Sequence, residues 1–153
     1  NSSLNQLDKW INAGLKVDAA LLFALIFGEY HEAMIEKKVE NNKNLFDKTR
    51  RVIDDHLNSI CSQIRIPKTI IYQVCDIMTH QIRFEKMNPK QSSRIAQSTG
   101  FINSFLYLKF SSKILLRNEN VLSFWQEIRN DNSSKTTSKK IGFQRRITKR
   151  FKK

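Results

Sequence analysis

Residues 19–27 read AALLFALIF, a run without a single polar side chain. A helix of this composition is apolar on all sides, which is typical of a helix at the centre of a protein rather than at its surface. Asp18 stands directly before the run and is a good N-cap residue for it. The run is about half as long as a membrane span requires. It therefore predicts a buried central helix on which the other elements pack.

Helical patterns lie on both sides of this run. Ser2–Ala13 places Leu4, Leu7 and Ile11 on one face, with Gly14 as a stop, which predicts a short first helix. After residue 27 the apolar pattern continues to Ile35 and then dissolves over residues 37–44. Residues 44–64 form the clearest amphipathic helix, because apolar residues recur there at the three- and four-residue spacing of one helix face. They are Leu45, Thr49, Val52, Ile53, Leu57, Ile60 and Ile64.

The second half of the chain continues in the same way. We expect Pro67 to be the first residue of another helix, which Asn88–Pro89 ends. A short polar helix over Lys90–Thr99, an apolar helix over Phe101–Ser112 and a last helix capped by Asn118 or Asn120 follow. Because the chain has only four Gly and two Pro and no strand-like alternation, the predicted fold class is all-α. We expect a compact domain of six to seven helices over residues 1–130, followed by a basic tail over residues 131–153.

Charge is unevenly distributed. The chain has 27 Lys and Arg against 14 Asp and Glu, a net charge of +13. Nine of the basic residues and no acid lie in residues 133–153, which leaves 18 basic residues against all 14 acids in residues 1–132. Residues 86–118 also contain six basic residues and no acid. A surplus of this size attracts polyanions, whether nucleic acid or an anionic membrane surface.

Catalytic and metal-binding patterns are absent from the sequence. It has no Gly-rich phosphate loop and no His-Glu-x-x-His motif. Neighbouring side chains of Asp54, Asp55 and His56 point about 100° apart on a helix, so we interpret the trio as ordinary helix surface. The three His and two Cys residues lack zinc-ligand spacing. Cys61 and Cys75 fall on apolar helix faces, which indicates buried free thiols and a reducing compartment such as the cytoplasm.

Two groups of basic residues are candidate RNA contacts. On the helix after Pro67, a polar stripe of Gln73, Asp76, His80 and Arg83 leads into further cations. The first group of predicted phosphate contacts is Arg83, Lys86, Lys90 and Arg94. The second group is Lys139, Lys140, Arg145, Arg146, Lys149, Arg150, Lys152 and Lys153. Cations at this density bind a nucleic-acid backbone with little sequence discrimination, and Phe143 and Phe151 could stack on unpaired bases. The tail could also form an amphipathic helix that contacts a membrane surface or a protein.

Several segments resemble a known family. Residues 17–27 (VDAALLFALIF) are similar to the VNPAFLFAAMFW segment of bacterial poly(A) polymerases, and Ile66-Pro67-Lys68 resembles the start of their IPK helix. Residues 101–109 stand in the place of their FRAAYDLLALR element, and Val121–Trp125 fits their LVKWW. Three positions depart from the pattern: Gly28 replaces an aromatic residue, Gln97–Thr99 replaces a His-Pro pair, and residues 101–103 lack an Arg. Order and spacing match over about residues 1–130.

The resemblance implies a parent enzyme that adds adenylate to RNA. Its catalytic head would lie upstream of residue 1 and would supply the carboxylates that hold Mg²⁺ and ATP, so no cofactor is expected in this chain. Since the chain begins with Asn rather than Met, we expect it to be an excised piece. The resemblance further implies that the helical region holds RNA so that its 3′ end reaches the head. The alternatives are a CCA-adding tRNA nucleotidyltransferase, which shares the architecture, and a basic helical module that binds a protein or a membrane.

Overall fold

The computed structural model describes residues 2–38, 44–60, 65–115 and 118–131, and within these ranges it contains helices and no strand. The helices are α1 (Ser2–Asn12), α2 (Ala19–Lys38), α3 (Leu45–Ile60), α4 (Lys68–Glu85), α5 (Pro89–Ala96) and α6 (Phe101–Leu115), with a further helix over residues 119–131. The predicted all-α fold is therefore confirmed.

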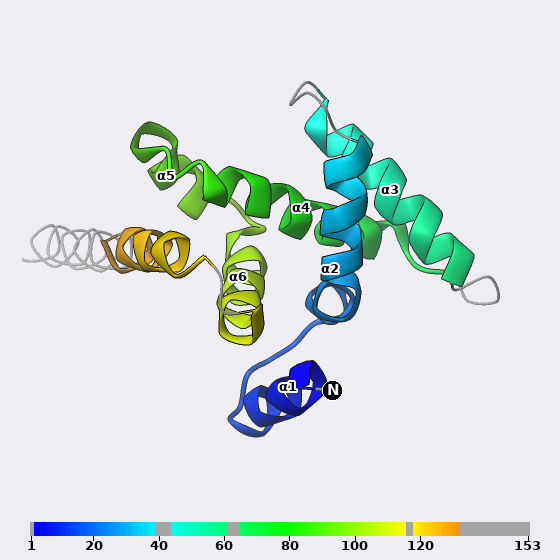
Figure 1. Ribbon diagram of the computed structural model, residues 1–153, viewed down its shortest axis with the longest axis horizontal. Helices are drawn as coiled ribbons and strands as arrows, with labels where there is room; N and C mark the ends of the chain where they lie inside the picture. Colours follow the sequence, from blue (N-terminus) through cyan, green and yellow to red (C-terminus); the bar gives the residue numbers. More distant parts are fainter. Residues whose placement is uncertain (1, 39–43, 61–64, 116–117, 132–153) are drawn as a thin grey trace, which may run out of the picture.

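Helix α4 is the centre of the molecule. It packs against α2, α3 and α6, and its apolar side chains Val74, Ile77 and Met78 are at most 1% exposed (Figure 1). The predicted central position of the AALLFALIF run was wrong in this respect, because α2 lies beside α4 and keeps one face in solvent. Leu22 and Ile26 on that face are 39% and 51% exposed.

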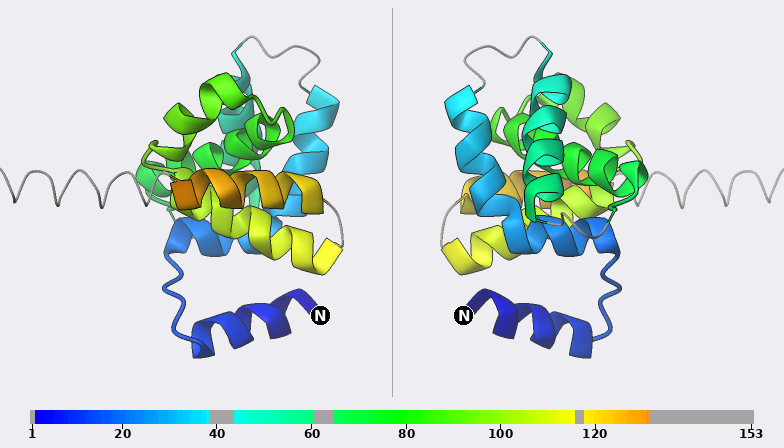
Figure 2. Two further views of the ribbon diagram at one scale, coloured as in Figure 1. Left: turned by 90° about the vertical axis from the view of Figure 1, so that its left-hand side faces the viewer. Right: turned by 90° about the vertical axis from the view of Figure 1, so that its right-hand side faces the viewer.

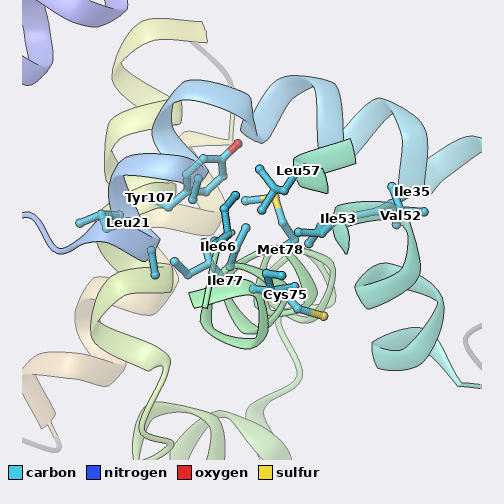
Figure 3. Packing of buried hydrophobic residues seen from close by; sticks show 14 residues of the cluster. Leu21, Ile35, Val52, Ile53, Leu57, Ile66, Cys75, Ile77, Met78 and Tyr107 are labelled. Atoms are coloured by element: carbon cyan, nitrogen blue, oxygen red, sulfur yellow. The ribbon is translucent and has the colours of Figure 1, made fainter. Parts of the chain in front are cut away.

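The buried residues form two clusters that meet along α4. The larger cluster joins α2, α3 and α4, and Tyr107 of α6 extends into it (Figure 3). The smaller cluster contains mainly aromatic side chains from α4, α6 and the helix over residues 119–131, among them Phe84, Phe101 and Trp125. The Trp125 indole Nε1 donates a hydrogen bond of 3.0 Å to the Phe84 carbonyl oxygen. This bond and the aromatic packing attach the last described helix to the end of α4.

Local signals fix most helix ends. The Asp18 carboxylate accepts a hydrogen bond of 2.8 Å from the Leu21 backbone N–H, so the predicted N-cap of α2 is confirmed. Pro67 is the N-cap of α4 rather than its first helical residue, because its ψ of 136° is extended. Helix α4 ends at Glu85. Asn88 is the N-cap of α5, where its side chain accepts a hydrogen bond from the Lys90 N–H, and Pro89 is the first residue of the helix.

Helix α1 lies at one edge of the molecule, and residues 13–18 connect it to α2 (Figure 2). Its Leu7 is 5% exposed, and the Trp10 ring meets the Phe110 ring of α6 edge to face, with centroids 5.3 Å apart. These apolar contacts hold α1 beside α6.

Some predictions fall beyond the described ranges. Helix α3 is described to Ile60, so the expected continuation to Ile64 and the expected burial of Cys61 lie outside them. Cys75 is buried as predicted. The helix over residues 119–131 reaches the last described residue, and the division of the chain near residue 130 stays a prediction.

Candidate nucleic-acid interface

The polar stripe of α4 is not a continuous solvent face. Gln73 and Arg83 are exposed at its two ends, but His80 is only 4% exposed. The turn between α5 and α6 covers the middle of the stripe. A Cβ atom at Gly100 would lie 3.3 Å from the Asp76 Cβ, so the absence of a side chain there lets the turn approach α4 closely. His80 therefore lies beneath this turn, although it belongs to the polar stripe that the sequence shows.

His80 holds this turn in place through both ring nitrogens. Nδ1 lies 2.8 Å from the Asp76 carbonyl oxygen, which can only accept, so Nδ1 carries the hydrogen and donates. Nε2 lies 3.1 Å from the Ser98 hydroxyl oxygen. Burial lowers the pKa of His80, although the hydrogen bond to the Asp76 carbonyl opposes this effect. The buried imidazole is a structural group here and is unsuited to contact a phosphate.

The predicted cations of the first group are all exposed. Arg83 stands in the last turn of α4, and Lys86 lies in the turn between α4 and α5. Lys90 and Arg94 are four residues apart on α5, so they share a helix face, while Ser92 and Ile95 on the other side are buried. The structure therefore brings these four cations to the surface of one short stretch, the end of α4 followed by α5.

Three acidic residues line a pocket, and one of them, Glu85, stands between Arg83 and Lys86 in the sequence. A pocket of about 200 Å³ between α2, α4 and α6 is lined by Glu32, Glu36 and Glu85 together with the apolar side chains of Ile35 and Met78. Three carboxylates in one pocket repel a phosphate group. The pocket is therefore unsuited to bind an RNA backbone. Among the described residues, the cations of α5 are the better candidate for that contact.

The second group of predicted RNA contacts, from Lys139 to Lys153, lies outside the described residues. The same holds for Phe143 and Phe151. Their assignment to the RNA backbone stays a prediction based on their density in the sequence.

Two histidines that are 25 residues apart in sequence meet between α2 and α3. His31 Nε2 and His56 Nδ1 are 3.0 Å apart and share a hydrogen bond. His31 is fully buried, and burial together with the neighbouring His56 lowers its pKa to about 4. Nothing in the sequence indicated His31 as the partner of His56.

The Asp54-Asp55-His56 trio separates as predicted. Asp54 accepts a hydrogen bond from Asn58 on the exposed side of α3, Asp55 is exposed, and His56 faces α2. Among the described residues, no group of three or more His, Cys, Asp or Glu side chains is placed to hold a metal ion. We assign no step of catalysis to these residues.

Cys75 is a core residue rather than a reactive thiol. Its Sγ lies 3.4 Å from the Phe46 carbonyl oxygen, and burial raises the pKa of the thiol to about 12. Within the described part of the chain, no helix combines the length and the apolar character that crossing a bilayer requires.

A known protein family matches most of the chain. No curated protein gives a match to the chain. The family model described as the polymerase A arginine-rich C-terminus matches residues 41–153. That match covers α3 to α6, the helix over residues 119–131 and the basic tail, and therefore most of the chain. The chain accordingly belongs to this family and is a C-terminal region of a poly(A) polymerase.

Proposed function

We propose that this chain binds single-stranded RNA near its 3′ end and holds it for ATP-dependent adenylate addition by a catalytic head of the parent polymerase. The chain would thus act in RNA polyadenylation, including that of mRNA, in the cytoplasm. The observation that carries the proposal is the exposure of four consecutive cations, Arg83, Lys86, Lys90 and Arg94, along the end of α4 and α5. Membership of a poly(A) polymerase family supports RNA as the polyanion.

The physical basis is the release of counterions. Each Lys or Arg that neutralises a phosphate frees a condensed cation, and this gain does not depend on base sequence. Lys90 and Arg94 lie one helical turn apart, and α5 itself contains no acidic residue. Such a surface suits a backbone that must slide as its 3′ end grows.

The tail adds to this surface in our proposal. Residues 133–153 carry nine basic residues and no acid. We assign them a non-specific electrostatic role, with residues 1–130 as the folded body that positions the RNA. Phosphate contacts position a chain without reading its sequence, so the tail is expected to raise affinity for any single-stranded RNA.

A salt titration of RNA binding tests the α5 surface, by which we mean the exposed face of α5 that carries Lys90 and Arg94. For single strands, the slope of log K against log salt changes by about 0.7 for each phosphate contact. Lys90→Gln/Arg94→Gln should therefore make the slope shallower by about 1.4. Lys37→Gln/Lys38→Gln removes two exposed charges at the end of α2 and is the matched control. Equal effects of the two double variants on affinity and slope would show that α5 has no particular role.

Removal of residues 133–153 tests the tail separately. We expect both a lower affinity and a shallower salt slope, and unchanged values for both would contradict the tail assignment. Binding to anionic vesicles that RNA fails to displace would favour a membrane-surface module instead. For the parent enzyme, product formation on tRNA without its CCA end, with ATP alone or with CTP plus ATP, distinguishes adenylate addition from CCA repair.

A further inference from the structure

A groove of about 340 Å³ lies between the end of α1 and the middle of α6. Its lining residues come from the last turn of α1, the chain that follows it, and one face of α6. They are Trp10, Ala13, Gly14, Leu15, Leu106 and Lys109. In the views of Figures 1 and 2, α6 lies between α1 and α5, so this groove and the α5 surface are separate. Its volume is at the lower end of the range of about 300–1,000 Å³ that is usual for small-ligand sites.

The end of α1 builds one wall of the groove. Gly14 has a φ of +86°, the left-handed conformation that ends a helix. The Gly14 N–H donates to the Ile11 carbonyl at 2.9 Å and the Leu15 N–H to the Trp10 carbonyl at 3.0 Å, which is the pair of bonds of a Schellman motif. These bonds fold Leu15 back beside Trp10. The wall is therefore set by the backbone and does not depend on a flexible side chain.

The Trp10 indole is held in place but not covered. Its edge-to-face contact with Phe110, at 82° between the ring planes, anchors it against α6. The side chain nevertheless remains partly exposed. The Lys109 ammonium lies 6.0 Å from the centre of the Trp10 ring, at the outer limit of a cation–π contact. A flexible, exposed lysine at that distance can move aside when a ligand approaches the ring.

The charges around the groove favour an anion. Lys113 follows Lys109 by one turn of α6, so both lie on the same helix face, and both are exposed. Helix α6 contains no acidic residue. Lys16, the neighbour of Leu15 in sequence, is exposed. The Asp18 carboxylate accepts hydrogen bonds from the Leu21 N–H at the start of α2 and from the Asn103 side chain. Asp8 on α1 is the one acid in the Ser2–Asn12 helix.

We propose that this groove takes one unpaired nucleobase of a bound RNA, stacked on Trp10, while Lys109 and Lys113 contact the phosphates beside it. The inference rests on the proposed RNA-binding function and adds a second contact point to the α5 surface. Stacking on an aromatic side chain accepts any base, since every base has a π-face. Lys109 exchanges its weak contact with the indole ring for a phosphate as the base enters.

Intrinsic fluorescence provides a direct test. The chain has two tryptophans, and Trp125 is fully buried, so a ligand that stacks on an indole changes the emission of Trp10 alone. We expect an oligoadenylate of about ten nucleotides to quench the tryptophan fluorescence of the full chain strongly and that of the Trp10→Phe variant hardly at all. Inorganic polyphosphate supplies charge without bases and should bind without quenching. Equal quenching by both probes would overturn the stacking.

Affinity measurements complete the test. Trp10→Leu should weaken oligoadenylate binding by about 5- to 100-fold, the loss expected for one stacked base, whereas Trp10→Phe should retain most of the affinity. Circular dichroism checks that the variants fold. Lys109→Gln/Lys113→Gln keeps the indole and should lower both affinity and salt slope.

The outcomes separate this groove from the α5 surface. If Lys90→Gln/Arg94→Gln weakens binding while Trp10→Leu binds normally and the full chain is not quenched, the groove assignment is wrong and the proposed function stands. If the full chain is quenched and Lys90→Gln/Arg94→Gln binds normally, the groove stands and the α5 assignment is wrong. An absence of oligoadenylate binding to the full chain would overturn both.

Discussion

At the scale of single residues, Gly28 shows how one missing side chain organises the core. A Cβ atom at Gly28 would collide with the ring and the hydroxyl of Tyr107, so the tyrosine of α6 occupies the space that a side chain on α2 would need. The Tyr107 hydroxyl donates to the Glu32 carboxylate at 2.9 Å, one turn further along α2.

Gly28→Ala is therefore expected to destabilise the protein. In a helix, alanine is favoured over glycine by about 1 kcal/mol, but overpacking a filled core costs about 1–3 kcal/mol. The collision with a buried ring outweighs the gain in helix propensity, and we expect a net loss of up to about 2 kcal/mol in the free energy of unfolding, measured by urea denaturation.

The background Tyr107→Leu provides the control for this prediction. With the ring removed, the added methyl group has room and only the gain in helix propensity remains. Gly28→Ala should then be neutral or stabilising relative to Tyr107→Leu alone. A similar loss in both backgrounds would show that the ring is not the cause.

At the scale of elements, Asp18 connects the start of α2 to α6. One carboxylate oxygen accepts from the Leu21 N–H at 2.8 Å, and the other accepts from the Asn103 side chain at 2.7 Å. The first bond satisfies a backbone donor at the start of the helix, and the negative charge interacts favourably with the helix dipole. Asn103 of α6 thereby holds the carboxylate in place at the start of α2.

Asp18→Ala should lower the free energy of unfolding by about 1–2 kcal/mol, because both bonds and the charge are lost. Asn103→Ala removes only the bond to α6 and should cost about 0.5–1 kcal/mol. Chemical denaturation of the two variants compares these values directly. A larger loss for Asn103→Ala than for Asp18→Ala would contradict the assignment of the cap as the main contribution.

At the scale of the whole molecule, buried histidines make stability depend on pH. The pKa of His31 is lowered to about 4 by burial and by His56, and burial lowers the pKa of His56 and of His80 as well. The rings of Phe27 and Tyr30 surround the His31–His56 pair. In this surrounding the neutral imidazoles are favoured in the folded protein.

The sign of the effect follows from proton uptake. Below the usual histidine pKa of about 6.5, the unfolded chain binds protons that the folded chain does not, so the free energy of unfolding falls as the pH decreases. For His31 the decline continues to about pH 4, where it amounts to about 3 kcal/mol. Above pH 7 the histidines are neutral in both states and contribute no pH dependence.

His31→Gln tests the source of this decline. Urea denaturation at several pH values from 7 to 4.5 should show a shallower loss of stability in the variant than in the original chain. His80→Gln is the comparison, because it removes another buried histidine but leaves the pair between α2 and α3 intact. A slope that His31→Gln does not change would rule out His31 as the main group.

The sequence alone determined the features that depend on neighbours along the chain. The cap at Asp18, the stop at Gly14 and the apolar faces of α3 and α4 were readable because a helix satisfies its own backbone bonds and repeats every 3.6 residues. The exposure of Lys90 and Arg94 on α5 was readable for the same reason. Membership of a poly(A) polymerase family was also visible in the order of short segments.

Only the tertiary structure decided which helix is central and which polar side chains are covered. The AALLFALIF run is apolar on every side, yet Leu22 and Ile26 face solvent because the helices that pack on α2 leave one of its faces uncovered. His80 belongs to a polar stripe, yet the turn at Gly100 buries it. His31 and His56, like Trp10 and Lys109, come together across helix contacts. Periodicity fixes which face of a helix is apolar, but packing between helices fixes what that face meets.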